Sequence, residues 1–442
     1  MQLKYRLDEI PKGSTLVLSS IQWFVFTLAN VITIPIVLGQ AFGLSQGDIA
    51  LYMERGFFVA GFVGLLQAFI GHRYSIIEGP AGMWWGVFLV LIQVTKDEGG
   101  SLPMLLREIE FGLLIAAAVF VLLGAFGWLG VIHKLFTPIV SGTYLVLIIL
   151  QVSKSIIDGI LGIGFHNRST VSPEIILLSI VLVALTLWLM FKGKGIIQSI
   201  AVLIGLVVGW ALYAALGLVE APQTKAPAFH LPNLFPFGPP KFHLGVTITC
   251  VLTAIILLSN LIASIQVFSD AAQEKAGNRE YNRGSLVTGI GTALAGIFGT
   301  AGMVPLTGSA SLVSLTGIAS RLPFVIASAG VALLGFFPVI GQWVATLPAP
   351  VGYAVLFPVF GQMFGFGLQN YKRLALNQRD IVIIALSVVT GVGIFFVPAT
   401  AWLGLPPVLS YILDNGLIVG IILSLIFEHV IFRSRNKSGQ SS

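Results

Sequence analysis

Long apolar runs dominate this chain and recur from near its first residue to near its last. Phe111–Ile132, Ile175–Phe191 and Ile196–Leu216 contain no charged side chain. A helix of about 17–25 apolar residues crosses a hydrocarbon core of roughly 30 Å. The runs do not alternate between apolar and polar residues, as the strands of a membrane barrel do. The pattern therefore predicts an all-α polytopic membrane protein.

Hydropathy divides the chain into about fourteen predicted spans, in two sets of seven. The first set is Thr15–Phe42, Gly56–Ile70, Ile76–Val94, Phe111–Ile132, Phe136–Val152, Ile175–Phe191 and Ile196–Leu216. The second set is Leu244–Phe268, Gly284–Ala301, Pro305–Ala319, Pro323–Val344, Val351–Leu368, Ile381–Val397 and Pro406–Phe432.

A proline-rich polar break separates the two sets. We predict a first seven-span repeat over residues 1–216, an outer loop over 217–243, a second repeat over 244–432 and a cytoplasmic tail over 433–442. Seven is an odd number, so the second set would enter the membrane from the opposite side. This is the arrangement of an inverted repeat, which many secondary transporters share.

Composition and charge agree with a membrane location. Of the 442 residues, 56% are hydrophobic and only 10% are charged, against roughly 25% charged in soluble domains. With the N-terminus in the cytoplasm, seventeen of the 24 Lys and Arg residues fall in inner segments, as the positive-inside rule requires. We expect a multi-pass protein of the cell membrane with both termini cytoplasmic. The net charge of +6 then needs no nucleic-acid partner.

Catalytic and metal-binding patterns are not found in the sequence. Cys250 is the single cysteine, so no disulfide framework is expected. The six histidines are scattered and lack metal-ligand spacing, and no nucleophile–base pair stands out. We predict neither an enzyme nor a bound cofactor or metal.

Two predicted spans, the third of each set, are interrupted by Gly, Pro and small hydroxyl residues. Their central sequences are Glu78-Gly79-Pro80-Ala81-Gly82 and Pro305-Leu306-Thr307-Gly308-Ser309-Ala310-Ser311. A half-helix that begins inside the membrane has free N–H groups and the positive end of its dipole, and proline suits its first turn. Two such ends would form a polar cavity for a small, flat, polar solute. The alternative is two kinked helices that only pack.

Glu78 is the most notable ionisable residue in the predicted spans. Carboxylates at membrane depth usually mark ion or proton pathways, so Glu78 is a candidate for ion coupling. Because His72 and Arg73 are close in sequence, an interfacial or helix-capping role is the alternative. For Asp414 in the last span, a structural role is favoured. Trp84 and Trp85 fit either stacking on a flat ring or packing.

From about Ser14 to Phe432 the chain resembles the nucleobase–ascorbate transporter family, the xanthine/uracil permeases. The resemblance rests on four segments: Ser20-Ile21-Gln22-Trp23, Gly79-Pro80-Ala81, the stretch from Pro305 through Ser314-Leu315-Thr316-Gly317-Ile318-Ala319-Ser320-Arg321, and Asp414-Asn415-Gly416. It implies fourteen spans as two inverted repeats, a core and a gate domain, and often a homodimer. It also implies import of a nucleobase such as a purine, usually with a proton or sodium ion.

This chain departs from the family pattern where carboxylates are usual. The acidic or Gln residue of the family signature falls on Gly308, its Asn on Ser309 and its Gly on Ser311. The usual substrate-binding Glu of the eighth span becomes Asn260, and a second acidic or His position becomes Ser264. Nothing at these positions titrates, so proton coupling would need another group.

Our hypothesis is that a base is held by neutral side chains and backbone. The predicted substrate-binding residues are Gln22, Gly79, Pro80, Ala81, Gly82, Asn260, Ser264, Thr307, Gly308, Ser309 and Ser311, and Glu78 is the remaining candidate for coupling. Amides and hydroxyls both donate and accept hydrogen bonds. The alternatives are a carrier of a small organic or inorganic anion on the same architecture, and a channel.

Overall fold

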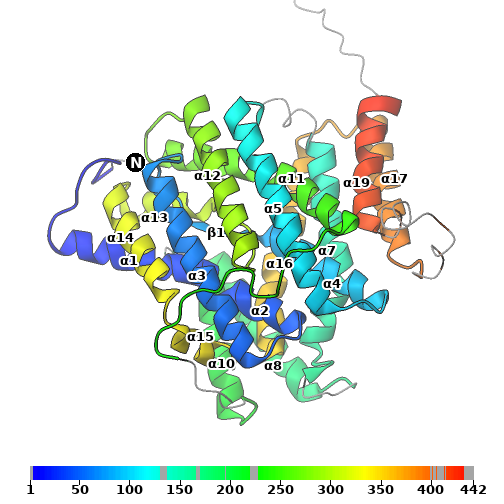
Figure 1. Cartoon of the computed structure of the whole chain (residues 1–442), viewed down its shortest axis with the longest axis horizontal. Helices are drawn as coiled ribbons and strands as arrows, with labels where there is room; N and C mark the ends of the chain where they lie inside the picture. The colour runs from blue at the N-terminus through cyan, green and yellow to red at the C-terminus, as the bar shows by residue number, and fades with distance from the viewer. Residues whose placement is uncertain are drawn as a thin grey trace, which may run out of the picture.

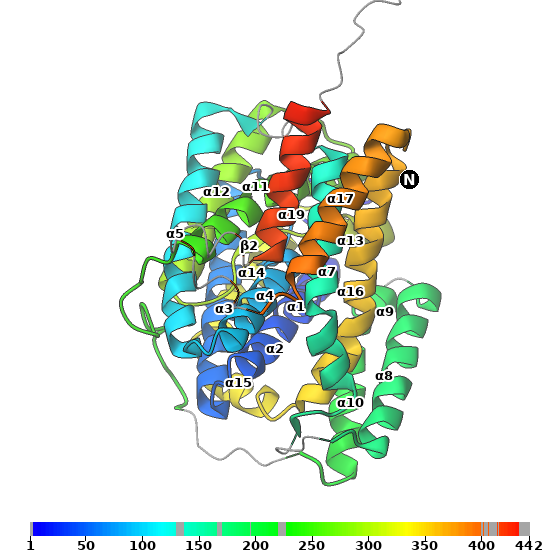
Figure 2. The same cartoon turned by 90° about the vertical axis from the view of Figure 1, so that its right-hand side faces the viewer.

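The computed structural model describes residues 3–129, 137–165, 170–194, 196–219, 227–398 and 415–432, together with residues 401, 405 and 413. In these ranges the chain is mainly helical, with a single pair of short strands inside the helix bundle (Figures 1 and 2). Asp414 and the predicted tail over 433–442 lie outside the described residues.

The first half of the chain contains one strand among its helices. Its elements are α1 (Ser14–Val31), α2 (Thr33–Ala41), α3 (Gln46–Phe69), β1 (Glu78–Pro80), α4 (Gly82–Asp97), α5 (Leu102–Phe126), α7 (Pro138–Ile160), α8 (Pro173–Lys192), α9 (Ile196–Ser199) and α10 (Ala201–Ala215).

The second half contains the other strand. Its elements are α11 (Leu244–Ala271), α12 (Asn278–Ile297), β2 (Met303–Pro305), α13 (Gly308–Thr316), α14 (Arg321–Leu334), α15 (Pro338–Val344), α16 (Ala349–Lys372), α17 (Gln378–Ile394), α19 (Gly416–Ile426) and the π-helix η3 (Phe427–Ile431).

Many of these helices are suited to a membrane. Seven in the described part are long and apolar enough to cross one: Ser14–Ala41 (α1 with α2), Gln46–Phe69, Leu102–Phe126, Pro138–Ile160, Pro173–Lys192, Leu244–Ala271 and Ala349–Lys372. Shorter apolar helices are Ala201–Ala215, Arg321–Leu334 and Gly416–Ile431. The count of fourteen spans, the repeat boundaries and the inverted symmetry stay predictions.

The second predicted span begins later in the sequence than the helix that the structure shows there. We expected it to start at Gly56, after the charged pair Glu54 and Arg55, but α3 begins at Gln46. Both charged side chains are buried inside the helix bundle. His230 pairs with Glu54 at 2.9 Å, and the Arg55 guanidinium lies over the ring of Phe237. These partners come from residues 227–243, far along the chain, so hydropathy alone could not reveal them.

Helices of the first half pack mainly against helices of the second. Helix α5 packs against α11 and α12, α3 against α14, and α7 against α16. Two Gly pairs, 61 with 64 and 205 with 209, lie at close helix contacts. The described part of the outer loop is bonded to helix ends: the Phe235 N–H donates to the Ile297 carbonyl at 2.7 Å.

Candidate functional site

The candidate site is built around the two strands. They run antiparallel, and Glu78 lies opposite Pro305, Gly79 opposite Val304 and Pro80 opposite Met303. All six residues are buried. Non-helical backbone at this depth needs partners for its polar groups, and each strand provides them for the other. Helix α4 begins at Gly82, directly after β1, and α13 begins at Gly308, shortly after β2.

Glycine is required where these strands meet their neighbours. A Cβ atom on Gly302, just before β2, would lie 2.4 Å from Nε1 of Trp84. A Cβ atom on Gly79 would lie 2.9 Å from a methyl carbon of Leu306. The strand pair therefore approaches α4 more closely than any residue with a side chain would allow.

Helix α11 fixes the end of β2 through two predicted site residues. The side-chain amide of Asn260 donates to the carbonyl oxygen of Pro305 at 3.0 Å. The Ser264 hydroxyl donates to the same oxygen at 2.8 Å. Ser264 is buried, whereas Asn260 is half-buried, so Asn260 keeps part of its amide accessible.

Helix α13 brings further predicted residues to the same place. The Ser309 hydroxyl accepts the N–H of Ile77, just before β1, at 2.9 Å. Thr307 and Ser311 are exposed and Gly308 is half-buried. Thr307 and Ser311 are four residues apart, so they share one helix face. That face is exposed, whereas Ser309 on the other side of α13 forms the hydrogen bond to the residue before β1.

Gln22 lies on α1, one helical turn from a residue that contacts the cluster. A Cβ atom on Gly308 would lie 3.4 Å from the ring of Phe26, and Gln22 is one helical turn before Phe26 on α1. Gln22 is half-buried. Its neighbour Trp23 is buried with its ring edge-on to Phe324, at 5.3 Å between centroids. The tryptophan is therefore a packing residue, and Gln22 is the polar one.

The remaining predicted residues complete the turn between β1 and α4. Ala81 is the buried residue between strand and helix. A Cβ atom on Gly82 would lie 2.9 Å from the sulfur of Met363 on α16. The structure thus brings predicted substrate residues together from β1, α4, α11, β2 and α13. Their role in binding stays a prediction.

Glu78 lies at this strand pair and faces a histidine. The carboxylate oxygen Oε1 is 3.6 Å from Nε2 of His72, and both side chains are fully buried. Nδ1 of His72 accepts the N–H of Tyr74 at 3.0 Å, so a neutral ring has its proton on Nε2, facing Glu78. Neither Nε2 nor the Glu78 oxygens have a hydrogen-bond partner in the described part of the chain.

A glutamine that we had not singled out supports His72. Gln67 on α3 accepts the His72 N–H at 3.2 Å. Its amide nitrogen donates to the Gly284 carbonyl and to the Thr288 hydroxyl, both at 3.1 Å. The sequence signal is only a lone amide in an apolar run, five residues before His72. Its partners on α12 lie more than two hundred residues away, so sequence alone could not pair them.

Other groups that the sequence singled out are buried or cap a helix. Trp84 and Trp85 are buried, and their rings pack on Phe88 and Phe360. Asn415 caps α19 by accepting the Ile418 N–H at 3.1 Å. Among the described residues, no group of three His, Cys, Asp or Glu side chains could hold a metal ion.

Comparison with known sequences gives a consistent picture. The sequence profile of the permease family of xanthine and uracil permeases matches residues 14–400. A Bacillus subtilis protein provisionally named purine permease YwdJ is 34% identical over 429 residues, which is 96% of this chain and 97% of that protein. Uric acid permease PucK of the same organism is 27% identical, with 95% and 96% of the two chains covered.

Solved structures share the fold at low sequence identity. The transmembrane domain of the cyanobacterial bicarbonate transporter BicA aligns with a TM-score of 0.58 at 16% identity, over 93% of this chain and 98% of that one. The murine anion transporter Slc26a9, in an inward-facing state, aligns with a TM-score of 0.61 at 12% identity, over 96% and 69% of the two chains. At such identity these matches show a shared fold alone.

Proposed function

Since the chain belongs to the permease family of xanthine and uracil permeases, we propose that it carries a purine base across the cell membrane as a secondary transporter. It is a multi-pass membrane protein and a permease, not an enzyme. The purine assignment is supported by relatives named as purine, xanthine and uric acid permeases. The single structural observation that carries the proposal is the convergence of polar groups at the β1–β2 pair.

In this proposal each strand and the helix after it form one broken membrane crossing. The N-terminal ends of α4 and α13 then present backbone N–H groups and positive dipole ends to a base. The fourteen spans and the two inverted seven-span repeats belong to the same proposal. Figure 2 supports it in one respect, since β2 lies well inside the bundle and not at its rim.

The base is recognised by uncharged amide and hydroxyl side chains. Asn260 holds the Pro305 carbonyl through its nitrogen and offers its amide oxygen to a ring N–H. Gln22 offers a second amide from α1, and the exposed Thr307 and Ser311 offer hydroxyls. Such groups recognise a planar edge with donors and acceptors without burying a charge.

The open face of α13 provides a path to the cytoplasm. Thr307, Ser311 and Ser314 are all exposed and follow one another at helical spacing. The last turn of α13 is next to the N-terminal segment, whose Lys4 N–H donates to the Gly317 carbonyl at 2.8 Å. With the N-terminus inside, these hydroxyls lead from the strand pair to the inner face.

Transport is coupled to a proton through Glu78 and His72. These residues replace the carboxylate that the family usually has on α11, where this chain has Asn260. Both groups can hold a proton, they face each other at 3.6 Å, and other partners for these atoms are absent from the described part of the chain. Glu78 is also the residue of β1 opposite Pro305, whose carbonyl Asn260 holds. Loss or gain of a proton at Glu78 thereby acts on the strand that contacts the substrate.

Ligand-dependent stability of the purified protein tests the proposal. A ligand that binds only the folded form raises the unfolding midpoint, and the rise grows with its concentration. We expect stabilisation by at least one of xanthine, hypoxanthine or guanine, and little by nucleosides or bicarbonate. Stabilisation by bicarbonate or small carboxylates alone would replace this proposal with an anion carrier. No stabilisation by any purine would contradict it.

A further inference from the structure

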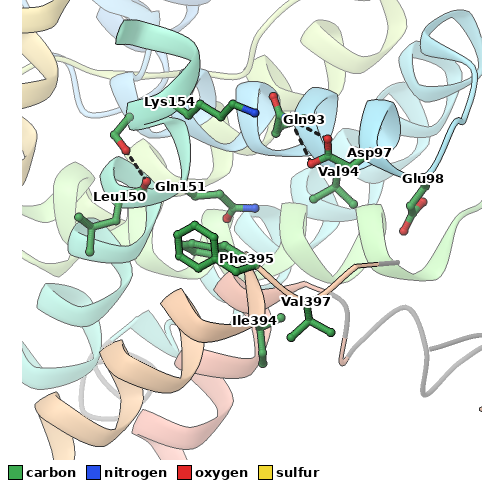
Figure 3. A pocket seen from close by; sticks show the side chains of 12 residues that line it. Gln93, Val94, Asp97, Glu98, Leu150, Gln151, Lys154, Ile394, Phe395 and Val397 are labelled. Atoms are coloured by element: carbon green, nitrogen blue, oxygen red, sulfur yellow. Dashed lines mark hydrogen bonds between the residues drawn. The ribbon is translucent and has the colours of Figure 1, made fainter. Parts of the chain in front are cut away.

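A cavity of about 250 Å³ lies well away from the strand pair, between α4, α7 and the end of α17 (Figure 3). Its polar lining comes from Gln93, Asp97 and Glu98 at the end of α4 and from Gln151 and Lys154 on α7. Helix α4 has 16 residues between Gly82 and Asp97, so the cavity is roughly 20 Å from the strand pair along that helix. By the predicted topology this is the outer side.

One wall of the cavity holds an ordered carboxylate. The amide nitrogen of Gln93 donates to both oxygens of Asp97, at 2.8 and 3.0 Å. The amide oxygen of Gln93 accepts the Ser155 hydroxyl at 3.4 Å. A carboxylate held in this way keeps lone pairs for further donors, and it accepts ring N–H groups through charge-assisted bonds.

The opposite wall offers a free acceptor and an aromatic face, and Lys154 offers a donor on the side of Gln93 (Figure 3). Figure 3 draws Gln151 next to Phe395, across the cavity from Gln93 and Asp97. The side-chain oxygen of Gln151 is buried and has no hydrogen-bond partner in the described part of the chain. Lys154 is exposed and forms no ion pair with the described residues. Phe395 supplies a flat apolar surface.

Size and charge together define the ligand class. The volume is below the roughly 300–1,000 Å³ of pockets for drug-sized ligands, which suits a molecule as small as a single base. Asp97, Glu98 and Lys154 leave a net negative lining, which disfavours small anions. A neutral planar heterocycle with N–H donors and carbonyl acceptors satisfies the carboxylate, the lysine and the free glutamine oxygen at once.

We propose that this cavity is an outer binding site, where a purine base is held through Asp97, Gln151, Lys154 and Phe395 before it reaches the strand pair. The inference rests on the proposed function. It concerns a second site with its own residues, so it can fail while the proposed function stands.

Transport measured from each side separates this role from a structural one. For Asp97→Asn and Gln151→Ala, we expect the apparent KM for uptake from the outside to rise about three- to tenfold, the loss of roughly one hydrogen bond. The KM for transport from the inner side, measured in inside-out vesicles, should stay within twofold of the parent. An equal change from both sides, or no change from either, would overturn the outer site.

The matched control is Lys96→Ala. Lys96 is on the same turn of α4 as Asp97, but its ammonium faces the Ala41 carbonyl at 3.5 Å and is not among the cavity residues. This variant should leave both KM values unchanged.

Direct binding distinguishes failure of the outer site from failure of the proposed function. In purified Asn260→Ala/Ser264→Ala protein, we expect residual, weak binding of labelled purine that is lost when Asp97→Asn and Lys154→Ala are added. If the parent binds purine but Asp97→Asn and Lys154→Ala leave the residual binding intact, the proposal of an outer site is wrong and the proposed function stands. If the parent binds no purine, both proposals fall.

Discussion

At the scale of single residues, Asn260 and Ser264 share one acceptor, the Pro305 carbonyl oxygen. Each substitution to Ala should lower the free energy of unfolding by about 1 kcal/mol. Because either donor can satisfy the oxygen, the double variant should lose more than the sum of the two single losses. Thermal or denaturant unfolding of the four proteins in detergent measures this.

Substrate binding should separate the same two residues. Asn260→Ala should weaken purine binding about tenfold, because the amide contacts the base, whereas Ser264→Ala should weaken it no more than about threefold. Ser19→Ala is the control, since that hydroxyl donates to carbonyl oxygens of its own helix. Equal losses of affinity for the two variants would show that Asn260 only supports the strand.

Glu78 provides a second residue-scale prediction. Glu78→Gln keeps the size and polarity of the side chain but cannot release a proton. Accumulation of base driven by a pH gradient should fall at least tenfold, while exchange of internal for external base continues. Glu174→Gln, at the exposed start of α8, should change neither. Undiminished accumulation by Glu78→Gln would remove it from the coupling pathway.

The sequence predicted many residues of the candidate site but not their contacts. The predicted breaks in two spans pointed to residues 78–82 and 305–311, and the family resemblance added Gln22, Asn260 and Ser264. The structure brings Asn260 and Ser264 to the strand pair. The sequence did not predict that Asn260 and Ser264 bind a backbone carbonyl. That contact joins residues more than forty positions apart, which no local pattern encodes.

At the scale of elements, close approach of α3 and α14 depends on Gly61. A Cβ atom there would lie 2.3 Å from the backbone nitrogen of Ala332 and 2.6 Å from the Ser328 carbonyl. Because backbone cannot move aside easily, Gly61→Ala should lower the free energy of unfolding by roughly 1–3 kcal/mol. Thermal unfolding in detergent would measure the loss.

The matched change is Gly393→Ala on α17, where the added carbon would have no atom within 4 Å from the rest of the described chain, apart from its own helix backbone and its two chain neighbours. Alanine is about 0.8–1 kcal/mol better than glycine within a helix, so this variant should be as stable as the parent or more so. A loss like that of Gly61→Ala would mean that helix contact does not explain the difference.

Element boundaries were predictable where composition changes sharply. The predicted span at Leu244 begins where α11 begins, because polar residues end there. Helix α3 shows the opposite case: hydropathy placed the boundary after Arg55, since it cannot anticipate that the buried Glu54 carboxylate is paired with His230. The strands β1 and β2 were not predicted as strands, because three-residue segments carry no periodic signal and form only by pairing with each other.

At the scale of the whole molecule, the orientation of the chain can be tested with its own cysteine content. Cys250 is the only cysteine and is buried, so Cys250→Ala gives a background for single cysteines at exposed positions. Cysteines replacing Lys96 and Lys241 should react with an impermeant maleimide in intact cells. Those replacing Lys192 and Lys372 should react only after permeabilisation. The reverse pattern would invert the predicted topology.

The membrane class was readable from the whole sequence because low charge and long apolar runs are global properties. The packing of first-half helices against second-half helices was not, since it depends on shape across the bundle. A homodimer, which the family resemblance implies, stays a prediction.

Uptake into proteoliposomes containing only this protein tests the central claim most directly. We predict saturable uptake of at least one labelled purine, inhibited by excess unlabelled base and reduced about tenfold or more by Asn260→Ala together with Ser264→Ala. Uptake no greater than in empty liposomes for every purine, from a preparation shown to be folded, would contradict the account.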